Sequence, residues 1–313
     1  MGVGKVAGHP DFSGAGVNKN IPWIFSKKTI TKFYKTSVLP SISNSEYEGE
    51  IKRYGDKVIM RTIPTVTISN YIKGQVVNYE NLESPSIELD IDKAKYFAFK
   101  MDKIDIKQFD IDMMNKCSED AAQQMAITID ADPLNVVYAD ASADNVGATA
   151  GLESGAFNLG VTGTPITLTK ANVLDYILHC QTVLQEQNIP DSERWMVIPA
   201  LMANIIQRSD LKNVDMSGDA VTPIRNGRLG TIGKFTLYES NNYTSVTDGA
   251  DTCYNILFGH KSALTFASQL VETEYHEKLE TTFGSAMKGL NVYGYKVIKP
   301  ASLGVLYAKF NIG

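Results

Sequence analysis

One stretch of the sequence has the composition of a phosphate-binding loop. Glycine recurs at every third position between 227 and 233, and Lys234 follows directly. A P-loop requires a glycine five residues before its final glycine and a serine or threonine after the lysine. Arg228 and Phe235 occupy these two positions, and an alternating apolar and polar pattern typical of a strand follows the lysine. We therefore interpret the segment as a turn that leads into a strand.

Aspartate pairs and histidines are the other residue types that could support acid–base or metal chemistry. The four histidines lack metal-ligand spacing, and no serine motif of the form G-x-S-x-G is present. Each aspartate pair is separated by one residue: Asp90 and Asp92, Asp110 and Asp112, Asp130 and Asp132. We expect the first pair to face solvent from a strand and the second to lie on the polar face of a long helix. We expect no catalytic residue, no cofactor and no metal site.

The overall composition is that of an ordinary globular chain. Its 313 residues allow roughly two domains, at about 150 residues each. The net charge of −5 and the isoelectric point near 5.5 argue against a dedicated nucleic-acid binder, which would carry a strongly basic face. No apolar run approaches the ~18 residues of a membrane span, and the first residues lack the apolar core of a secretory signal. We therefore expect assembly or action in a cytoplasm.

The first hundred residues predict an arm followed by a thin β excursion. Residues 1–22 lack hydrophobic periodicity and are typical of a mobile arm. An amphipathic helix with a basic face follows from Trp23 and ends before Pro40; this face is either solvated or contacts a membrane or nucleic acid. Strand patterns occupy four segments: 51–54 as a hairpin with 57–71, then 87–91 and 96–101. Because a two-stranded ribbon is marginally stable alone in water, something else must cover it.

The remainder predicts one long helix and then a compact α/β region. Apolar residues step by three or four from Ile106 to Ile129 with no helix breaker before Pro133, which gives a rod of roughly 39 Å. Cys117 and Cys180 lie at apolar helical positions, so we interpret both as small core residues. A glycine-rich connector and further elements follow: connector 139–165, helix 173–184, strand 194–198, a helix from Pro199, and strands 235–238, 254–258, 264–266, 270–271, 290–297 and 303–310.

Four strings in this order carry a resemblance to a known family. They are residues 194–199, 230–242, 258–269 and 292–300. The first is a strand that ends in proline and enters a helix, and the second matches the pattern G-x-I-G-x-F-x-(V/L)-Y-x-S-N. Together with the order of the elements, these strings resemble the major capsid (coat) proteins of tailed bacteriophages, which have the Hong Kong ninety-seven-type fold. The similarity covers most of the chain from about residue 23.

The resemblance implies an α+β fold in five consecutive parts. These are an N-terminal arm (1–45), an extended β-hairpin loop or E-loop (46–101), a peripheral domain with a long spine helix (102–150), an axial domain (151–258) and strands that return to the peripheral domain (259–313). The implied function is structural, not enzymatic: copies self-assemble through pentamers and hexamers into the icosahedral shell of a virion around double-stranded DNA. A separate scaffolding protein and a portal are further implied partners, with assembly in the host bacterial cytoplasm, no membrane contact and no sequence-specific DNA binding.

An arm and a ribbon that cannot cover their own apolar residues require neighbouring copies to bury them, and such heterologous contacts close into rings where the rotation permits. The expected inter-subunit contacts are Trp23, Phe33, Ile63, Ile68 and Tyr71. Three other interpretations stay open at this point. They are an encapsulin-type nanocompartment shell, a monomeric α/β enzyme that uses the aspartate pairs or His260, and a tail-tube or tail-sheath subunit that forms open filaments.

Overall fold

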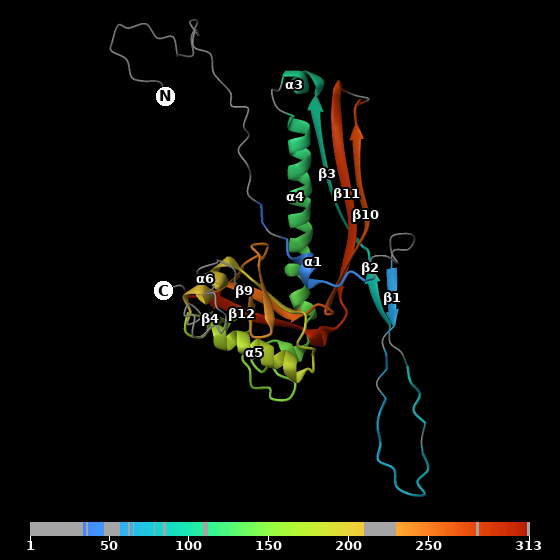
Figure 1. Ribbon diagram of the computed structural model, residues 1–313, viewed down its shortest axis with the longest axis vertical. Coiled ribbons are helices and arrows are strands. Elements are labelled where there is room, and N and C mark those ends of the chain that lie inside the picture. The colour runs from blue at the N-terminus through green and yellow to red at the C-terminus, as the bar shows by residue number, and fades with distance from the viewer. Residues whose placement is uncertain are drawn as a thin grey trace, which may run out of the picture.

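A computed structural model of the chain (Figure 1) gives its fold. It describes residues 34–35, 37–46, 57–61, 63–64, 66–77, 79–83, 86–108, 112–209, 230–279 and 282–311. The expected mobile arm over 1–22 and the part of the expected basic helix up to residue 33, with Trp23 and Phe33, lie outside these residues. The remainder of that helix was expected to run to Pro40, but residues 34–35 and 37–38 are not helical.

The larger sheet is built around β5 (Arg194–Ile198), whose five residues are all buried. Its strands run in the order β4-β12-β9-β5-β7-β6, and β8 pairs with β9. Strand β5 is central because it pairs parallel with β7 and antiparallel with β9. The remaining elements of this part are β4 (Ile166–Leu168), β6 (Thr231–Ile232), β7 (Phe235–Glu239), β8 (Val246–Asp248), β9 (Asp251–His260), β12 (Leu303–Phe310), α5 (Val173–Glu186) and α6 (Ala200–Arg208).

The two faces of β5 pack against different parts of the chain, because side chains alternate along a strand. Met196 and Ile198 belong to a core that they share with α5 and α6. Trp195 and Val197 face the opposite way and pack in a second apolar cluster. Cover on both faces explains why the strand is apolar over most of its length. The strand predicted at 194–198 and the helices predicted on either side of it are confirmed.

The second sheet is long and narrow and lies along one helix (Figure 1). Strands β3 (Lys93–Asp102), β10 (Leu264–His276) and β11 (Gly284–Val297) are antiparallel in the order β10-β11-β3. Lys95 of β3 forms an ion pair of 3.4 Å with Asp132 near the end of this helix. The side chain of Lys95 therefore points toward the helix, and Tyr96, the next along the strand, points away.

The helix beside this sheet corrects the predicted single rod from Ile106. The structure has a short helix α3 (Lys103–Gln108) and then α4 (Met113–Leu134), whose 22 residues span about 33 Å. The Asp112 side chain accepts a hydrogen bond from the Asn115 backbone N–H (3.3 Å), which caps a new helix at this point. Asp112 is thus an N-cap, whereas the sequence predicted that it would lie on the polar face of the helix. Pro133 lies within the last turn of α4, so the helix continues through this proline to Leu134.

The two parts meet at a junction cluster, defined here by α1 (Leu39–Ile42) and the residues packed around it. Leu39 and Ile42 are buried against Ile129 and Leu134 of α4 and against Trp195 of β5. Pro40 lies in the first turn of α1, where its missing N–H costs no helical hydrogen bond. Within the described residues, the chain also forms 3-10 helices at Val137–Asp140, Ala143–Asn145 and Pro300–Ser302.

The β excursion differs from the prediction in the length of its strand, whereas the predicted hairpin arm 51–54 lies outside the described residues. Strand β1 (Lys57–Arg61) pairs antiparallel with β2 (Ser86–Asp90), and the described residues between 63 and 83 contain no strand. Pro64 cannot donate a ladder hydrogen bond, so the predicted strand to residue 71 ends early. Leu89 and its neighbours pack on Ala267 of the long sheet. The base of the excursion is therefore anchored, and the loop between β1 and β2 extends away from the rest of the chain (Figure 1).

Candidate assembly surfaces

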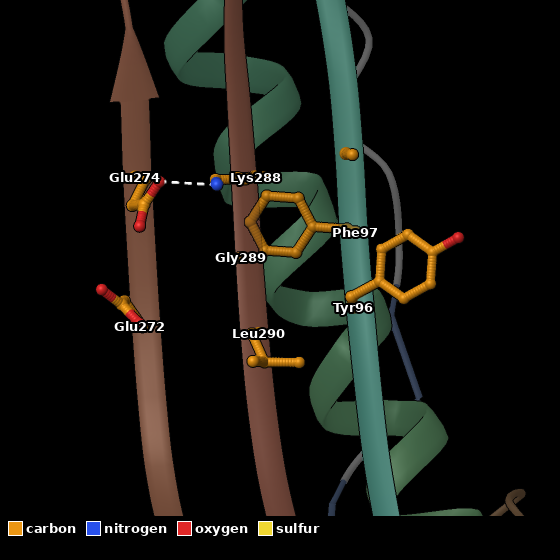
Figure 2. Close-up of a pocket in the computed structure, with 8 residues that line it drawn as sticks. Tyr96, Phe97, Glu272, Glu274, Lys288, Gly289 and Leu290 are labelled. Carbon is orange, nitrogen blue, oxygen red and sulfur yellow. Dashed lines mark ion pairs between the residues drawn. The ribbon is translucent and has the colours of Figure 1, made fainter.

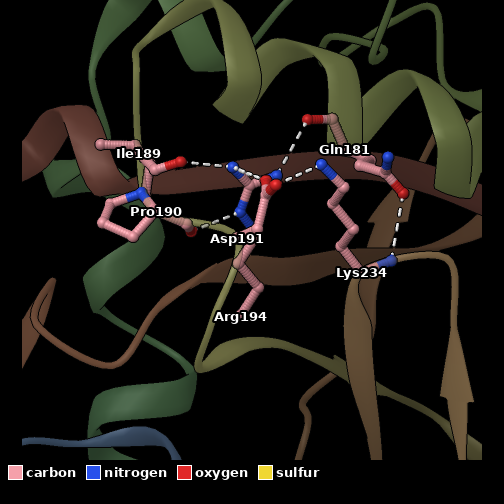
Figure 3. Close-up of polar contacts among 6 residues, drawn as sticks. All are labelled: Gln181, Ile189, Pro190, Asp191, Arg194 and Lys234. Carbon is pink, nitrogen blue, oxygen red and sulfur yellow. Dashed lines mark hydrogen bonds and ion pairs between the residues drawn. The ribbon is translucent and has the colours of Figure 1, made fainter.

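The glycine and lysine segment is a tight hairpin turn between β6 and β7. Gly233 has a φ of +58°, in the left-handed region that favours glycine. The Lys234 backbone N–H donates to the Gln181 side-chain oxygen (3.1 Å), and its ammonium group forms an ion pair with Asp191 (Figure 3). The hydrogen bond from Lys234 lowers the pKa of Asp191. These contacts confirm the interpretation of the segment as a turn into a strand.

The buried side chain of Arg194 stabilises the same region through contacts with the loop before β5 (Figure 3). Its guanidinium group is buried and donates to the backbone oxygens of Ile189 (2.5 Å) and Pro190 (2.8 Å). Asp191 lies 3.0 Å from this guanidinium, so one carboxylate is shared by Arg194 and Lys234. The charges of this cluster are satisfied within the chain, and the cluster fixes the loop before β5 to the β6–β7 turn.

The aspartates proposed for chemistry have structural partners. Asp90 is exposed and forms an ion pair of 3.0 Å with Lys57, and Asp92 is exposed beside Lys93. The solvent exposure expected for this first pair is confirmed. The structure does not describe Asp110.

The third pair divides between two roles. Asp132 accepts from the Tyr293 hydroxyl and is paired with Lys95. Desolvation by burial, followed by this hydrogen bond, raises the pKa of Tyr293. Asp130 is fully buried and accepts hydrogen bonds from neutral groups, an arrangement that the sequence pattern did not indicate.

The remaining groups with chemical potential are also held in local contacts. His260 Nδ1 lies 2.9 Å from the Ser262 hydroxyl and accepts from the Ser262 backbone N–H (3.1 Å), and burial lowers the pKa of this histidine. Cys180 is buried as predicted, whereas Cys117 is only half-buried. No cluster of potential metal ligands occurs in the part of the chain that the structure describes. Nor, within those same residues, is there a helix with the length and apolarity to cross a bilayer.

The loop between β1 and β2 carries many exposed large apolar side chains, and we call it the apolar loop (63–83). Ile63 is 95% exposed and Ile68 is 90% exposed. Thr67 and Glu80 are linked across the loop. The Thr67 backbone N–H and hydroxyl each donate a hydrogen bond of 3.1 Å to the Glu80 carboxylate. More than half of each of these side chains is exposed: Ile63, Val66, Ile68, Tyr71, Ile72, Val76, Val77, Tyr79 and Leu82. Apolar surface on this scale marks an interaction site.

A shallow hollow of about 350 Å³ lies on the long sheet. Tyr96, Ala98 and Leu290 contribute apolar surface to it, and Glu272 and Glu274 stand on its β10 side (Figure 2). Lys288 is 2.7 Å from Glu274, and this hydrogen bond lowers the pKa of the glutamate. No described cation forms an ion pair with Glu272. We call this surface the sheet hollow; the other residues that line it are Phe97 and Gly289.

The end of the long sheet at which β3 leads into α3 and β11 begins also carries exposed apolar side chains. Ile104 at the start of α3 is 63% exposed, and Phe283 just before β11 is 87% exposed. The Lys103 backbone N–H donates to the Phe283 carbonyl (2.9 Å), so the two segments are adjacent. This tip is a third surface with apolar side chains that its own chain leaves uncovered.

Three of the five predicted inter-subunit contacts can be placed. Ile63, Ile68 and Tyr71 all lie in the apolar loop and are exposed. Their role as contacts stays a prediction. Tyr79 and Phe283, which are also exposed, were not predicted from the sequence. Phe283 stands among threonine, glycine and serine, and Tyr79 lies between Asn78 and Glu80 without the periodicity that marks a strand or helix face.

The comparisons with known proteins agree with this architecture. Residues 86–306 match the model of a family described as phage capsid protein. A solved structure from Mycobacterium phage Che8 is 25% identical, with a TM-score of 0.75 over 95% of this chain and 98% of that one. A capsid structure of the cyanophage P-SCSP1u is 13% identical, with a TM-score of 0.69 over 95% and 96%. The mature capsid of bacteriophage PhiM1 is 17% identical, with a TM-score of 0.65 over 97% of both chains. No curated protein sequence matches the chain.

Proposed function

We propose that this chain closes with copies of itself into an icosahedral shell around double-stranded DNA. The premise is that the chain belongs to the phage capsid protein family and is a tailed-phage major capsid protein. The observation that carries the proposal is the apolar loop, whose side chains the chain itself leaves exposed although the base of the loop is anchored. A neighbouring copy is the partner that is always present in a shell. Pentamers and hexamers, a separate scaffolding protein, a portal and assembly in the host cytoplasm belong to the same proposal.

We assign the sheet hollow of a neighbouring copy as the surface that receives the tip of the apolar loop. Ile72 and Lys73 stand side by side at this tip, and both are exposed. The hollow offers apolar surface next to Glu272, a carboxylate without an ion pair among the described residues. An isoleucine beside a lysine therefore matches apolar surface beside a carboxylate. The E-loop boundaries at 46 and 101 and the axial and peripheral divisions of the chain are part of this proposal.

Contacts of this kind account for a stable shell from weak parts. Each fully buried isoleucine or valine contributes about 1.5–3 kcal/mol. A specific interface hides about 1,600 Å² in total. Because each copy contacts several neighbours in a closed shell, interfaces of modest strength keep every subunit in place.

Imaging of the purified chain tests the proposal. We expect electron microscopy and analytical sedimentation to show closed, uniform particles, or rings that close into particles when a scaffolding protein is co-expressed. Particles recovered from infected cells should contain nuclease-protected DNA. Open filaments, particles from infected cells that all enclose a protein cargo and no nuclease-protected DNA, or monomers that stay monomeric at high concentration would each contradict the proposal.

A further inference from the structure

Asp130 is a buried carboxylate whose partners come from distant parts of the chain. It lies near the C-terminal end of α4 and is fully buried. Its Oδ1 accepts hydrogen bonds from the Ser37 hydroxyl (2.9 Å) and from the backbone N–H groups of Val38 (2.8 Å) and Leu39 (2.7 Å). Its Oδ2 accepts from the side-chain amide of Asn242. Among the described residues, no cation forms an ion pair with it.

This arrangement makes the carboxylate dependent on residues 37–39. A buried charge is tolerated only where hydrogen-bond donors replace the water that it loses. Three of its four donors belong to residues 37–39, and the fourth belongs to Asn242 in the segment after β7. If residues 37–39 moved away, the carboxylate would lose three of its four hydrogen-bond donors. The folded subunit therefore holds this segment firmly against α4.

The same segment is fixed again immediately downstream. Asn44 forms a parallel bridge to the long sheet, because its N–H donates to the Leu264 carbonyl (2.8 Å) and its carbonyl accepts from the Phe266 N–H (3.1 Å). Leu39 and Ile42 are buried in the junction cluster between these two attachments. Residues 37–44 are thus secured at both ends and in the middle.

Upstream, the chain follows α4 toward its N-terminal end. The Tyr34 hydroxyl donates to Asp120 (3.0 Å), at an exposed position. Asp120 and Asp130 are ten residues apart on the helix, which corresponds to about 15 Å. Tyr34, the first described residue, therefore lies beside the middle of α4.

We infer that Asp130 is a positioning residue, which fixes residues 37–44, the last part of the predicted N-terminal arm (1–45), against α4. This role concerns the single subunit and does not rest on the proposed function. The carboxylate also ties residues 37–39 to the segment after β7. One side chain thus holds these residues, α4 and the larger sheet in a single arrangement.

Exchange of the paired side chains tests the inference. Asn242→Asp places a second carboxylate against Asp130, so we expect amide hydrogen exchange over 37–44 in the unassembled subunit to accelerate by at least about a hundredfold. Asp130→Asn alone keeps an acceptor for the backbone N–H groups but loses its charge, and should accelerate exchange roughly tenfold. The double variant restores a donor and an acceptor in reversed positions, and should return exchange to within about threefold of Asp130→Asn.

The control carries the same substitution elsewhere on the helix. Asp120→Asn combined with Asn242→Asp should give no recovery. If Asn242→Asp does not fold, the comparison of Asp130→Asn with the double variant still decides. Unchanged exchange over 37–44 in Asp130→Asn, or a double variant that exchanges more than about threefold faster than Asp130→Asn, would overturn the inference. Particle imaging of the same variants separates the two claims, because the exchange data do not depend on whether shells form.

Discussion

The central strand β5 and the apolar loop are both rich in apolar residues, yet the chain treats them in opposite ways. Every residue of β5 is buried, because α5 and α6 cover one face and the junction cluster covers the other. In the apolar loop, by contrast, most of the large side chains are exposed and the described hydrogen bonds run only within the loop. The difference lies in the elements that surround each segment. Apolar sequence without covering elements among the described residues is what we expect of a surface that another copy completes, as proposed above.

The largest expected effect separates the two regions by stability. Phe258 of β9 is fully buried and packs edge-on against Phe235. Phe258→Ala should lower the free energy of unfolding of the unassembled subunit by about 3–5 kcal/mol, because a cavity remains in the core. Tyr79→Ala in the apolar loop should change it by less than about 0.5 kcal/mol. Urea unfolding of both variants measures the contrast, and a comparable loss for Tyr79→Ala would show that the loop packs on its own chain.

Two glycines show the same difference between the packed part of the chain and the apolar loop at the level of the backbone. Gly160 has a φ of +82°, and a Cβ there would lie 2.2 Å from the Tyr307 carbonyl oxygen. Gly74 in the apolar loop has a φ of +91°, with no atom within 4 Å of an added Cβ. Gly160→Ala should cost about 2–4 kcal/mol, since backbone strain and a clash combine. Gly74→Ala should cost about 1 kcal/mol from strain alone. Thermal unfolding that ranks the two variants in the opposite order would contradict this account.

The sequence predicted the segments whose neighbours in the chain determine their structure. The run from Trp195 to Ile198 is apolar at every position, which is typical of a strand covered on both faces, and the proline that follows marks the start of a helix. The turn before Phe235 was also predictable. The segment does not satisfy the P-loop pattern, and a tight turn then explains its glycines. In each case the decisive residues lie within about ten positions of one another.

The features that the sequence did not predict depend on long-range partners. Strand β1 pairs with β2, which begins 25 residues after β1 ends, and no local pattern identifies that partner. Asp130 resembles one half of an acid pair, but its donors lie more than 90 residues away in both directions. The start of α4 was missed for a local reason, since the Asp112 cap interrupts an apolar periodicity that continues on both sides of it.

Assembly is the property on which a change in the apolar loop should act. Ile68→Asp replaces an exposed apolar side chain with a charge and removes a contact worth about 1.5–3 kcal/mol when buried. The subunit concentration needed for particles should rise roughly ten- to a hundredfold, while urea unfolding of the free subunit stays unchanged. Sedimentation velocity across a concentration series measures the shift. Ser69→Asp adds the same charge next to this position without loss of apolar surface, and equal inhibition by both variants would point to charge alone.

The smallest expected effect tests where the loop binds. If Lys73 of one copy lies near Glu272 of its neighbour, Lys73→Glu and Glu272→Lys should each weaken assembly only a few-fold, because an exposed ion pair contributes about 0.2–1 kcal/mol. The double variant should recover most of this loss, and the recovery should fade above about 0.5 M salt as the charges are screened. Glu277→Lys serves as a matched control, because Glu277 is exposed just after the end of β10 and does not line the sheet hollow. Recovery with that control instead of Glu272→Lys would place the tip of the loop on a different surface, and the contrast between a self-covered core and a loop completed by another copy would then stand with a different receiving site.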